Sequence, residues 1–570
     1  MSLSNRSPGS VLAGLVLALA LILVVGWPAA ATVLSAWRGP SAATGEGLLE
    51  ADGTSSRLDP PLRQAGETLR LVLATEAMAL PVGVVLALVL FRTDLWGRRA
   101  LLGLVALAVF IPLPLHTIAW LGAFGNAGRA QLFGLAPVLV GWKGAAFVHA
   151  MAALPWVVLL AGVGLRTVEP ELEEAALLDW PAWRVVLGVT LRRGLGAIAG
   201  AALAVAVLTA GDMTVTDLLQ VRTYAEVAYI QYQLGNGPAV AAAVALPPLI
   251  VLGGLVLWAA WGLLRADPAR IPSPSTRARL WRLGRWRWLL GLAVWLTVGN
   301  AVALPIDSLI WRAGRVGGAA AAGKAPHWSL QGLVGSLGMA WADVVGPLLK
   351  SGLWGALGAS ATVVLAWGLA WVSRRPGAWR WVVAGTVALA LATPGPVAGM
   401  ALVLAYLPPP IEPGTSRLVA LLFDIQAAFY DSQAIVLLGY VLRTLPYALL
   451  ILWPAVRSIP ESYLDAAAVD GYGPWGQIRL VALPMTRGAT LAAWFAAFAL
   501  ALGELPVTNL VEPPSRTTLL AKRVWELMHY GVESRLAAVG LVMLAAIGAV
   551  GLLAAWALGR LYGPRAEDST

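Results

Sequence analysis

Runs of about 20 apolar residues, the length at which a helix crosses a lipid bilayer, recur along the whole chain. Hydrophobic residues make up 59% of the 570 residues and charged residues 12%, which is more apolar surface than a soluble protein of this size can bury. The sequence therefore predicts an all-α integral membrane protein with about twelve transmembrane helices. The expected spans lie near residues 11–36, 68–91, 100–123, 138–165, 195–219, 239–264, 288–312, 350–373, 379–407, 433–456, 485–510 and 536–560.

A basic segment separates the twelve spans into two groups of six. We predict a first half over residues 1–264, a linker over 265–287 and a second half over 288–570. The linker carries three prolines followed by five arginines. The stretches 37–66 and 313–349 are expected to be loops on the opposite, external side of the membrane.

Arginines in short loops predict the orientation of the chain. They cluster at 92–99, 265–287 and 374–380, and basic loops remain in the cytoplasm. Both termini of this multi-pass membrane protein are then expected to be cytoplasmic. The net charge of +10 follows from this topology, so we expect the lipid bilayer and no nucleic acid as a partner. The first apolar run exceeds the roughly 7–15 residues of a signal peptide, which predicts an uncleaved first span.

Several kinds of reactive site have no counterpart in the sequence. The chain has no cysteine, and its four histidines lack the paired spacing of metal ligands. It also lacks the phosphate-binding Gly-x-x-x-x-Gly-Lys-Ser/Thr motif. We therefore expect no catalytic residue, no metal site and no cofactor bound by this chain.

Matching residues in the two halves predict an internal repeat. At offsets of 282 to 292 residues, Arg92 matches Arg374, Pro112-Leu113-Pro114 matches Pro394-Gly395-Pro396, Pro155 matches Pro446, Arg166 matches Arg457, and Gly211-Asp212 matches Gly503-Glu504. The two Pro-x-Pro breaks fall inside the third and ninth spans, where proline kinks a helix. Such a kink either serves packing alone or lines a cavity.

The loop near 457–484 has the most specific pattern in the chain. Its defining residues are Asp465, Ala466, Ala467, Gly471, Leu483 and Pro484. Ser458-x-x-Glu461 has the form of a capping box that begins a helix, and Gly471 suits the left-handed backbone that ends one. A second short helix is expected to end at Pro484, where the next span begins. The alanines leave a nearly bare face for another protein; the alternative is an amphipathic helix lying in the headgroup layer.

A weaker copy of this pattern lies near 166–194. It consists of Glu174, Ala175, Ala176 and Asp179. Trp180 stands where glycine is expected, and Arg192 stands where the final proline is expected. The first loop must therefore bend in another way, and Pro181 is the candidate.

The second loop resembles the signature loop of permease subunits of bacterial binding-protein-dependent ABC importers. The signature reads Glu/Asp-Ala-Ala, three residues, Gly, nine residues, an aliphatic residue, any residue and Leu-Pro. The second loop meets this pattern fully. A fused pair of homologous six-helix halves is similar to the group that includes the ferric-iron and thiamine permeases. The resemblance implies a coupling helix in each loop, docked on a cytoplasmic ABC ATPase dimer that holds the ATP. It also implies a periplasmic or extracellular binding protein that delivers the solute.

Polar and ionisable residues inside spans are candidates for a substrate pathway, because charge is costly there. The candidates are Glu76, Lys143, His149, Asp212, Asp217, Glu504 and Asn509. Asp212 and Glu504 occupy matching places, so the repeat predicts that both face the interface between halves. Glu76 is alternatively a structural carboxylate, and Lys143 alternatively snorkels outward. The acidic residues favour a cationic solute, such as ferric ion or a small organic cation.

Two other classes of protein compete with an importer permease. A twelve-span secondary transporter also has repeats and carboxylates near the midplane, but it would not need two glycine-hinged helical loops in the cytoplasm between spans four and five and between spans ten and eleven. A membrane-embedded enzyme needs a cluster of nucleophile or ligand residues at one face, and the sequence shows no such cluster.

Overall fold

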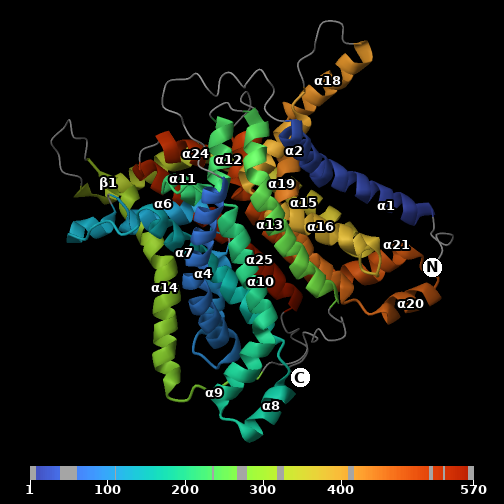
Figure 1. The fold of residues 1–570 in the computed structure, drawn as a ribbon. Helices are drawn as coiled ribbons and strands as arrows, with labels where there is room; N and C mark the ends of the chain where they lie inside the picture. Colours follow the sequence, from blue (N-terminus) through green and yellow to red (C-terminus); the bar gives the residue numbers. More distant parts are fainter. Residues whose placement is uncertain are drawn as a thin grey trace.

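The structure, a computed structural model, describes residues 8–38, 61–109, 111–126, 128–233, 237–265, 279–317, 327–408, 416–512, 518–530 and 533–562. In these ranges the chain is almost entirely helical, with one antiparallel pair of two-residue strands (Figure 1). The predicted all-α membrane class is confirmed. Most of the predicted linker and of the predicted loop at 37–66 lies outside the described residues.

The helices of residues 8–265 are α1 (Pro8–Leu21), η2 (Ile22–Gly26), α2 (Trp27–Arg38), α4 (Pro61–Arg92), α5 (Arg98–Ala108), α6 (Leu113–Phe124), η3 (Arg129–Phe133), α7 (Gly141–Arg166), α8 (Pro170–Asp179), α9 (Ala182–Val185), η4 (Val186–Thr190), α10 (Leu191–Ala210), α11 (Thr214–Leu218), α12 (Tyr224–Gln233) and α13 (Gly237–Arg265). The remaining elements are α14 (Trp286–Ala313), β1 (Arg315–Val316), β2 (His327–Trp328), α15 (Leu330–Val372), α16 (Ala378–Ala392), α17 (Gly395–Tyr406), α18 (Arg417–Tyr430), α19 (Ala434–Arg457), α20 (Glu461–Val469), α21 (Pro474–Gln477), η7 (Ile478–Ala482), α22 (Leu483–Leu502), α23 (Leu505–Val511), α24 (Leu520–Tyr530) and α25 (Glu533–Tyr562).

Ten described helices are long and apolar enough to cross a membrane, or twelve spans if each of two bent helix pairs counts as one. The bent pairs correspond to the third and ninth predicted spans. The chain turns by 107° between α5 and α6, and by 110° between α16 and α17. The breaks expected at the two Pro-x-Pro sequences are confirmed, and the bend at each is far larger than a kink within one continuous helix.

Proline and burial explain the two elbows. Pro112 and Pro394 have extended backbone, with ψ of 146° and 153°, and each immediately precedes the next helix. A proline at this position interrupts the helix before it and suits the start of the helix after it. Nearly every residue of α6 and α17 is buried. Their apolar sequences therefore serve packing inside the protein rather than contact with lipid.

The predicted external loop at 313–349 is also wrong. Helix α15 begins at Leu330 and continues without a break through Pro347 to Val372. The sequence favoured a counterpart of the Gly-, Ser- and Pro-rich loop at 37–66, but Ser336, Ala340 and Val344 are buried in a helix. Because α15 packs against α24 and α25, tertiary contacts override the weak local preference for helix.

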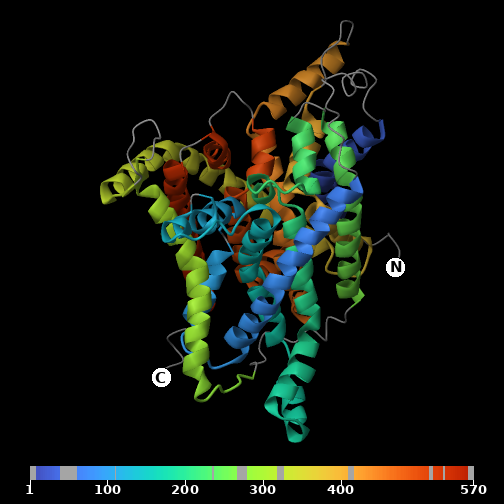
Figure 2. The same cartoon turned by 60° about the vertical axis from the view of Figure 1, so that its left-hand side comes forward.

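Helices of one half pack on helices of the other. Helix α1 and the turn η2 contact α15 and α19, and α2 contacts α17. Helix α14 of the second half contacts α5 and α6 of the first half (Figure 2). Helix α13 of the first half contacts α16 of the second half. The two halves are thus interlocked, and the elbows lie in the interior between them.

Candidate functional site

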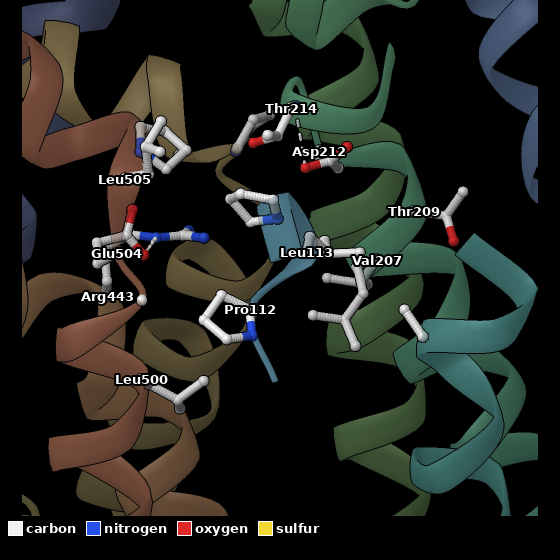
Figure 3. Close-up of a pocket in the computed structure, with 18 of the residues that line it drawn as sticks. Pro112, Leu113, Val207, Thr209, Asp212, Thr214, Arg443, Leu500, Glu504 and Leu505 are labelled. Atoms are coloured by element: carbon white, nitrogen blue, oxygen red, sulfur yellow. Dashed lines mark hydrogen bonds and ion pairs between the residues drawn. The ribbon is translucent and has the colours of Figure 1, made fainter. Parts of the chain in front are cut away.

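A cavity of about 190 Å³ lies between the two elbows (Figure 3). Its walls come from the ends of α10 and α22, from the middle of α7 and α19, and from the elbows themselves. Its lining includes Pro112 and Asp212 of the first half and Pro394 and Glu504 of the second half. The structure therefore brings the predicted pair Asp212 and Glu504 into one cavity between the halves.

Asp212 combines a helix cap with a contact to histidine. Its carboxylate accepts hydrogen bonds from the backbone N–H groups of Thr214 (3.1 Å) and Val215 (2.8 Å), the first turn of α11. His149 Nε2 lies 3.2 Å from Asp212 Oδ2, and His149 Nδ1 lies 2.8 Å from the Ala145 carbonyl oxygen. A carbonyl only accepts, so this network assigns the first proton to Nδ1. A second proton on Nε2 converts the contact with Asp212 into an ion pair.

Glu504 has the matching role in the second half. Its side chain caps α23 by accepting from the backbone N–H of Val507, and Arg443 Nε lies 3.3 Å from its Oε2. Arg443 Nη1 also donates to the carbonyl of Thr393, at 2.8 Å, immediately before the elbow. One guanidinium thus connects α19, the second elbow and the start of α23.

Each elbow lies against a glycine of the opposite half. A Cβ atom at Gly503 would be 3.1 Å from Pro112 Cγ and 3.3 Å from Pro112 Cβ. A Cβ atom at Gly211 would be 3.6 Å from Pro394 Cα and 3.9 Å from Pro394 Cβ. A Cβ at 503 would be crowded by Pro112, so glycine allows the close approach there, whereas a Cβ at 211 would make an ordinary van der Waals contact with Pro394.

The fixed charges of the cavity are mixed. Two carboxylates, a guanidinium and an imidazole line it, and each carboxylate has a basic partner. At the offset that relates Pro155 to Pro446, Ala152 takes the place of Arg443, and Ala152 also lines the cavity. The expectation of a cationic solute rested on acidic residues along the path; in the structure Glu504 has a guanidinium partner and Asp212 lies beside the His149 ring.

Asp217 and Asn509 do not line the cavity; each forms a bridge between the halves. His529 Nε2 of α24 lies 3.0 Å from Asp217 Oδ2 of α11. Asn509 Nδ2 of α23 donates to the hydroxyl of Tyr229 on α12, at 3.2 Å. Tyr229 also packs edge-on against Trp525 of α24, with ring centroids 5.6 Å apart. These contacts tie α11 and α12 to α23 and α24.

The other predicted intramembrane candidates lie apart from the cavity. Glu76 is half-buried on α4 and Lys143 is exposed near the start of α7, and neither residue belongs to the lining. Arg443 was missed, although a lone arginine inside the apolar run 433–456 was a signal of the same kind. His529 was missed because α24 was not recognised as a helix.

The second loop has the expected left-handed glycine but not the expected capping box. Gly471 has φ of +86° just after α20, as predicted. Ser458 instead ends α19, and its hydroxyl donates to the carbonyl of Ala455 at 2.9 Å. Pro460 is the residue that precedes α20. The preceding helix ends at Arg457, one residue beyond the expected span 433–456, and Ser458 is the residue at its C-terminal cap.

Pro484 does not begin a new span, which corrects a further expectation. The helix starting at Pro474 continues through η7, a π-helical turn, into α22 and ends at Leu502. The wider π turn relieves the clash that a proline makes with the carbonyl four residues earlier. The first loop has the same turn, η4, between α9 and α10.

The first loop bends at Trp180 and Pro181. Both residues have extended backbone, with ψ of 144° and 152°, so the bend predicted at Pro181 is confirmed. The turn needs no left-handed residue, which explains how tryptophan is tolerated where the second loop has glycine. The Trp180 ring lies 3.2 Å from the place a Cβ of Gly188 would occupy.

The signature residues of both loops are mainly exposed. The exposed ones are Glu174, Ala175, Asp179, Asp465, Ala466, Gly471, Leu483 and Pro484, whereas Ala176 is half-buried and Ala467 is buried. Leu178 and Val469 are each 87% exposed at the ends of α8 and α20. Such exposed aliphatic side chains beside alanines form a surface suited to a protein partner.

Surface ion pairs accompany these loops. Arg193 lies 2.7 Å from Glu169 and Arg279 lies 3.3 Å from Glu174. A hydrogen bond from its own backbone and the contact with Arg193 hold the pKa of Glu169 below its usual value. Exposed pairs of this kind contribute little to stability.

Residues 362–567 match the family described as binding-protein-dependent transport system inner membrane component. This region contains the second elbow, the second loop and most of the helices of the second half.

Three characterised permeases are similar to parts of the chain. The molybdenum transport system permease protein ModB of Haemophilus influenzae is 31% identical over 140 residues, covering 23% of this chain and 61% of that protein. The spermidine/putrescine transport system permease protein PotC of Escherichia coli K12 is 22% identical over 148 residues, covering 26% and 54%. The putrescine transport system permease protein PotI of the same strain is 26% identical over 131 residues, covering 23% and 46%. The chain thus spans about half to three-fifths of the relatives that it matches.

Proposed function

We propose that this chain is the membrane-spanning permease of an ATP-driven, binding-protein-dependent ABC importer, with both permease halves fused in one polypeptide. The family match over residues 362–567 carries this proposal for the second half. For the first half, the support is the same order of elements: an elbow, a span, an exposed loop helix, a π turn and a further span. The proposed boundaries are residues 1–264, 265–287 and 288–570.

In this proposal the loops of both halves dock on the two subunits of a cytoplasmic ATPase. Helices α8 and α20 lie on the side of the molecule away from α12, α18 and α24 (Figure 1). Their exposed ends at Leu178 and Val469 would fit grooves of that partner. The chain has no phosphate-binding motif of its own, so ATP would be held by the partner. Both termini and the basic linker would be cytoplasmic.

The cavity between the elbows would be a closed part of the solute pathway. Opening it requires Pro112 and Pro394 to move away from Gly503 and Gly211, where they now lie in close contact. ATP-driven movement of α8 and α20 would separate or join the halves and so open the cavity alternately to each side. A binding protein on the external side would deliver the solute.

The substrate class is a small solute, and the cavity does not support ferric ion. Both lining carboxylates already have basic partners, and the described residues contain no group of three His, Cys, Asp or Glu able to hold a metal ion. The similar permeases are named for molybdenum and for polyamines, which differ widely in chemistry. A mixed-charge cavity accords with a path whose selectivity lies in the binding protein.

A secondary transporter is the competing function, and a reconstitution distinguishes the two. The chain would be purified with its ATPase and placed in liposomes with the binding protein outside. Solute uptake that requires both ATP and loaded binding protein supports the importer. Uptake driven by an ion gradient without ATP would reject it.

A further inference from the structure

One buried carboxylate joins the first loop to the membrane helices. Glu173 lies on α8, next to the exposed Glu174, and its side chain is fully buried. It pairs with Arg92 Nη2, and its Oε1 accepts a hydrogen bond from Thr190 Oγ1 at 2.5 Å. Arg92 Nη1 donates to the carbonyl of Leu165 at 2.7 Å. A single side chain therefore connects α8 with the ends of α4 and α7 and with the π turn η4.

The second loop is attached by apolar packing at the same places. At the offsets of the repeat, Leu464 replaces Glu173 and Ala482 replaces Thr190. Leu464 is 3% exposed and Ala482 is fully buried. Both belong to a hydrophobic cluster that also contains Val456 and Ile459. Arg374, which matches Arg92, lies instead over the ring of Trp371, 3.9 Å from its centroid.

The two attachments respond differently to a change of charge. A buried ion pair has defined geometry, and loss of one partner leaves an uncompensated charge in a low-dielectric site. Neutralising Glu173 would therefore release α8 from Arg92. The attachment of α20 contains no buried ion pair: its contact of Glu461 with Arg375 is exposed, and such a pair contributes little.

We propose that Arg92, Glu173 and Thr190 are positioning residues that fix the first coupling helix to the membrane helices. This assignment rests on the proposed function. In it, movement of α8 is transmitted to α4, α7 and α10 through the buried ion pair of Arg92 and Glu173. Leu464 and Ala482 perform the same task in the second half by packing. The polar attachment of α8 and the apolar attachment of α20 then serve the same purpose, which is to hold each coupling helix against the membrane helices, and one can replace the other.

The first test measures the attachment without any transport. Because the chain contains no cysteine, Leu178→Cys or Val469→Cys introduces a single site for a nitroxide label on α8 or α20. In the full chain in nanodiscs, Glu173→Gln should increase label mobility at 178 and leave it unchanged at 469. Glu169→Gln, which removes only the surface pair with Arg193, is the matched control and should change neither.

The second test measures coupling in the complete complex. Glu173→Gln should reduce the solute imported per ATP hydrolysed at least tenfold, with normal assembly. In the triple variant, Glu173→Leu and Thr190→Ala copy Leu464 and Ala482 of the second half, and Arg92→Leu removes the buried charge that would otherwise be left without its partner. This variant should restore both immobilisation at 178 and most of the coupling. If Glu173→Gln is not produced, Thr190→Val removes one hydrogen bond and should shift both readouts in the same direction by a smaller amount.

The possible results separate this inference from the proposed function. Unchanged mobility at 178 in Glu173→Gln and Thr190→Val, or an equal increase at 469, would overturn the positioning role. A triple variant that assembles but does not regain coupling would refute the interchangeability of the two attachments. Absence of ATP-dependent uptake in the unmodified complex would reject the importer instead, and the mobility measurements would still decide the attachment.

Discussion

Gly211 and Pro394 are in contact across the two halves of the chain. A Cβ atom built on Gly211 would lie 3.9 Å from Cβ of Pro394, and the pair Gly503 and Pro112 repeats this relationship from the other side. Each proline begins a buried helix after a turn of about 110°, and each glycine ends a membrane-spanning helix. The contact therefore places the bend of one half on the helix end of the other, beside the cavity.

This contact can be locked by a disulfide. Cysteine pairs bond at a Cβ–Cβ distance of about 3.5–4.5 Å, so Gly211→Cys with Pro394→Cys should crosslink on oxidation. In the reconstituted complex, the oxidised variant should lose uptake and recover it with a reducing agent. Each single cysteine variant is the control and should be unaffected by the oxidant. Full uptake by a completely crosslinked chain would show that the elbows need not separate during transport.

The two carboxylates that line the cavity, Asp212 and Glu504, are tested together in one double variant. Asp212→Asn with Glu504→Gln should reduce uptake about tenfold, a change of about 1.4 kcal/mol in activation free energy, because Arg443 and His149 would lose their partners inside the cavity. Protein level and assembly with the ATPase are measured in parallel. Asp343→Asn, in an ion-pair group on α15 away from the cavity lining, is the comparison. Normal uptake at normal expression would remove both carboxylates from the pathway.

The two loops should respond unequally to exchange of their hinge residues. Gly471 has φ of +86°, where a residue with a side chain costs roughly 1–2 kcal/mol, whereas Trp180 is extended. We expect Gly471→Trp to abolish ATP hydrolysis stimulated by the loaded binding protein, and Trp180→Gly to have a mild effect. Equal damage, or greater damage from the first-loop change, would contradict unequal coupling.

The orientation of the chain is tested at the linker. The arginine clusters at 92–99, 265–287 and 374–380 predict a cytoplasmic position for residue 275. A reporter enzyme that is active only in the periplasm, fused after residue 275, should therefore give no signal. Fusion within 39–60, predicted to be external, provides the positive control. A strong signal at 275 would reverse the topology.

The sequence predicted the helical class and most spans from hydropathy. Repeat spacing predicted that Asp212 and Glu504 both face the interface between the halves, where they line one cavity. It could not distinguish an apolar helix in lipid from one buried in protein. The third and ninth spans were therefore expected to cross the bilayer with a break at Pro-x-Pro, although most residues of α6 and α17 are buried in protein. Residues 330–349 were assigned to a loop because their stability as a helix comes from packing on α24 and α25.

Side-chain pairing was less accessible to sequence reasoning. The Ser-x-x-Glu pattern at 458–461 predicted a cap, but its serine belongs to the end of the preceding helix. Arg443 and Glu504 are far apart in the chain, so their contact required the fold. The same holds for the buried pair of Arg92 and Glu173, since nothing in the local sequence separates the buried Glu173 from the exposed Glu174.

The central claim is that ATP hydrolysed by a partner drives solute through the path between the two halves. The most direct measurement is solute uptake into liposomes that contain the chain and its ATPase, with the binding protein added outside. The account predicts uptake only when ATP and the loaded binding protein are both present, and no uptake with the oxidised Gly211→Cys, Pro394→Cys chain. Uptake that proceeds without ATP, or without the binding protein, would contradict it.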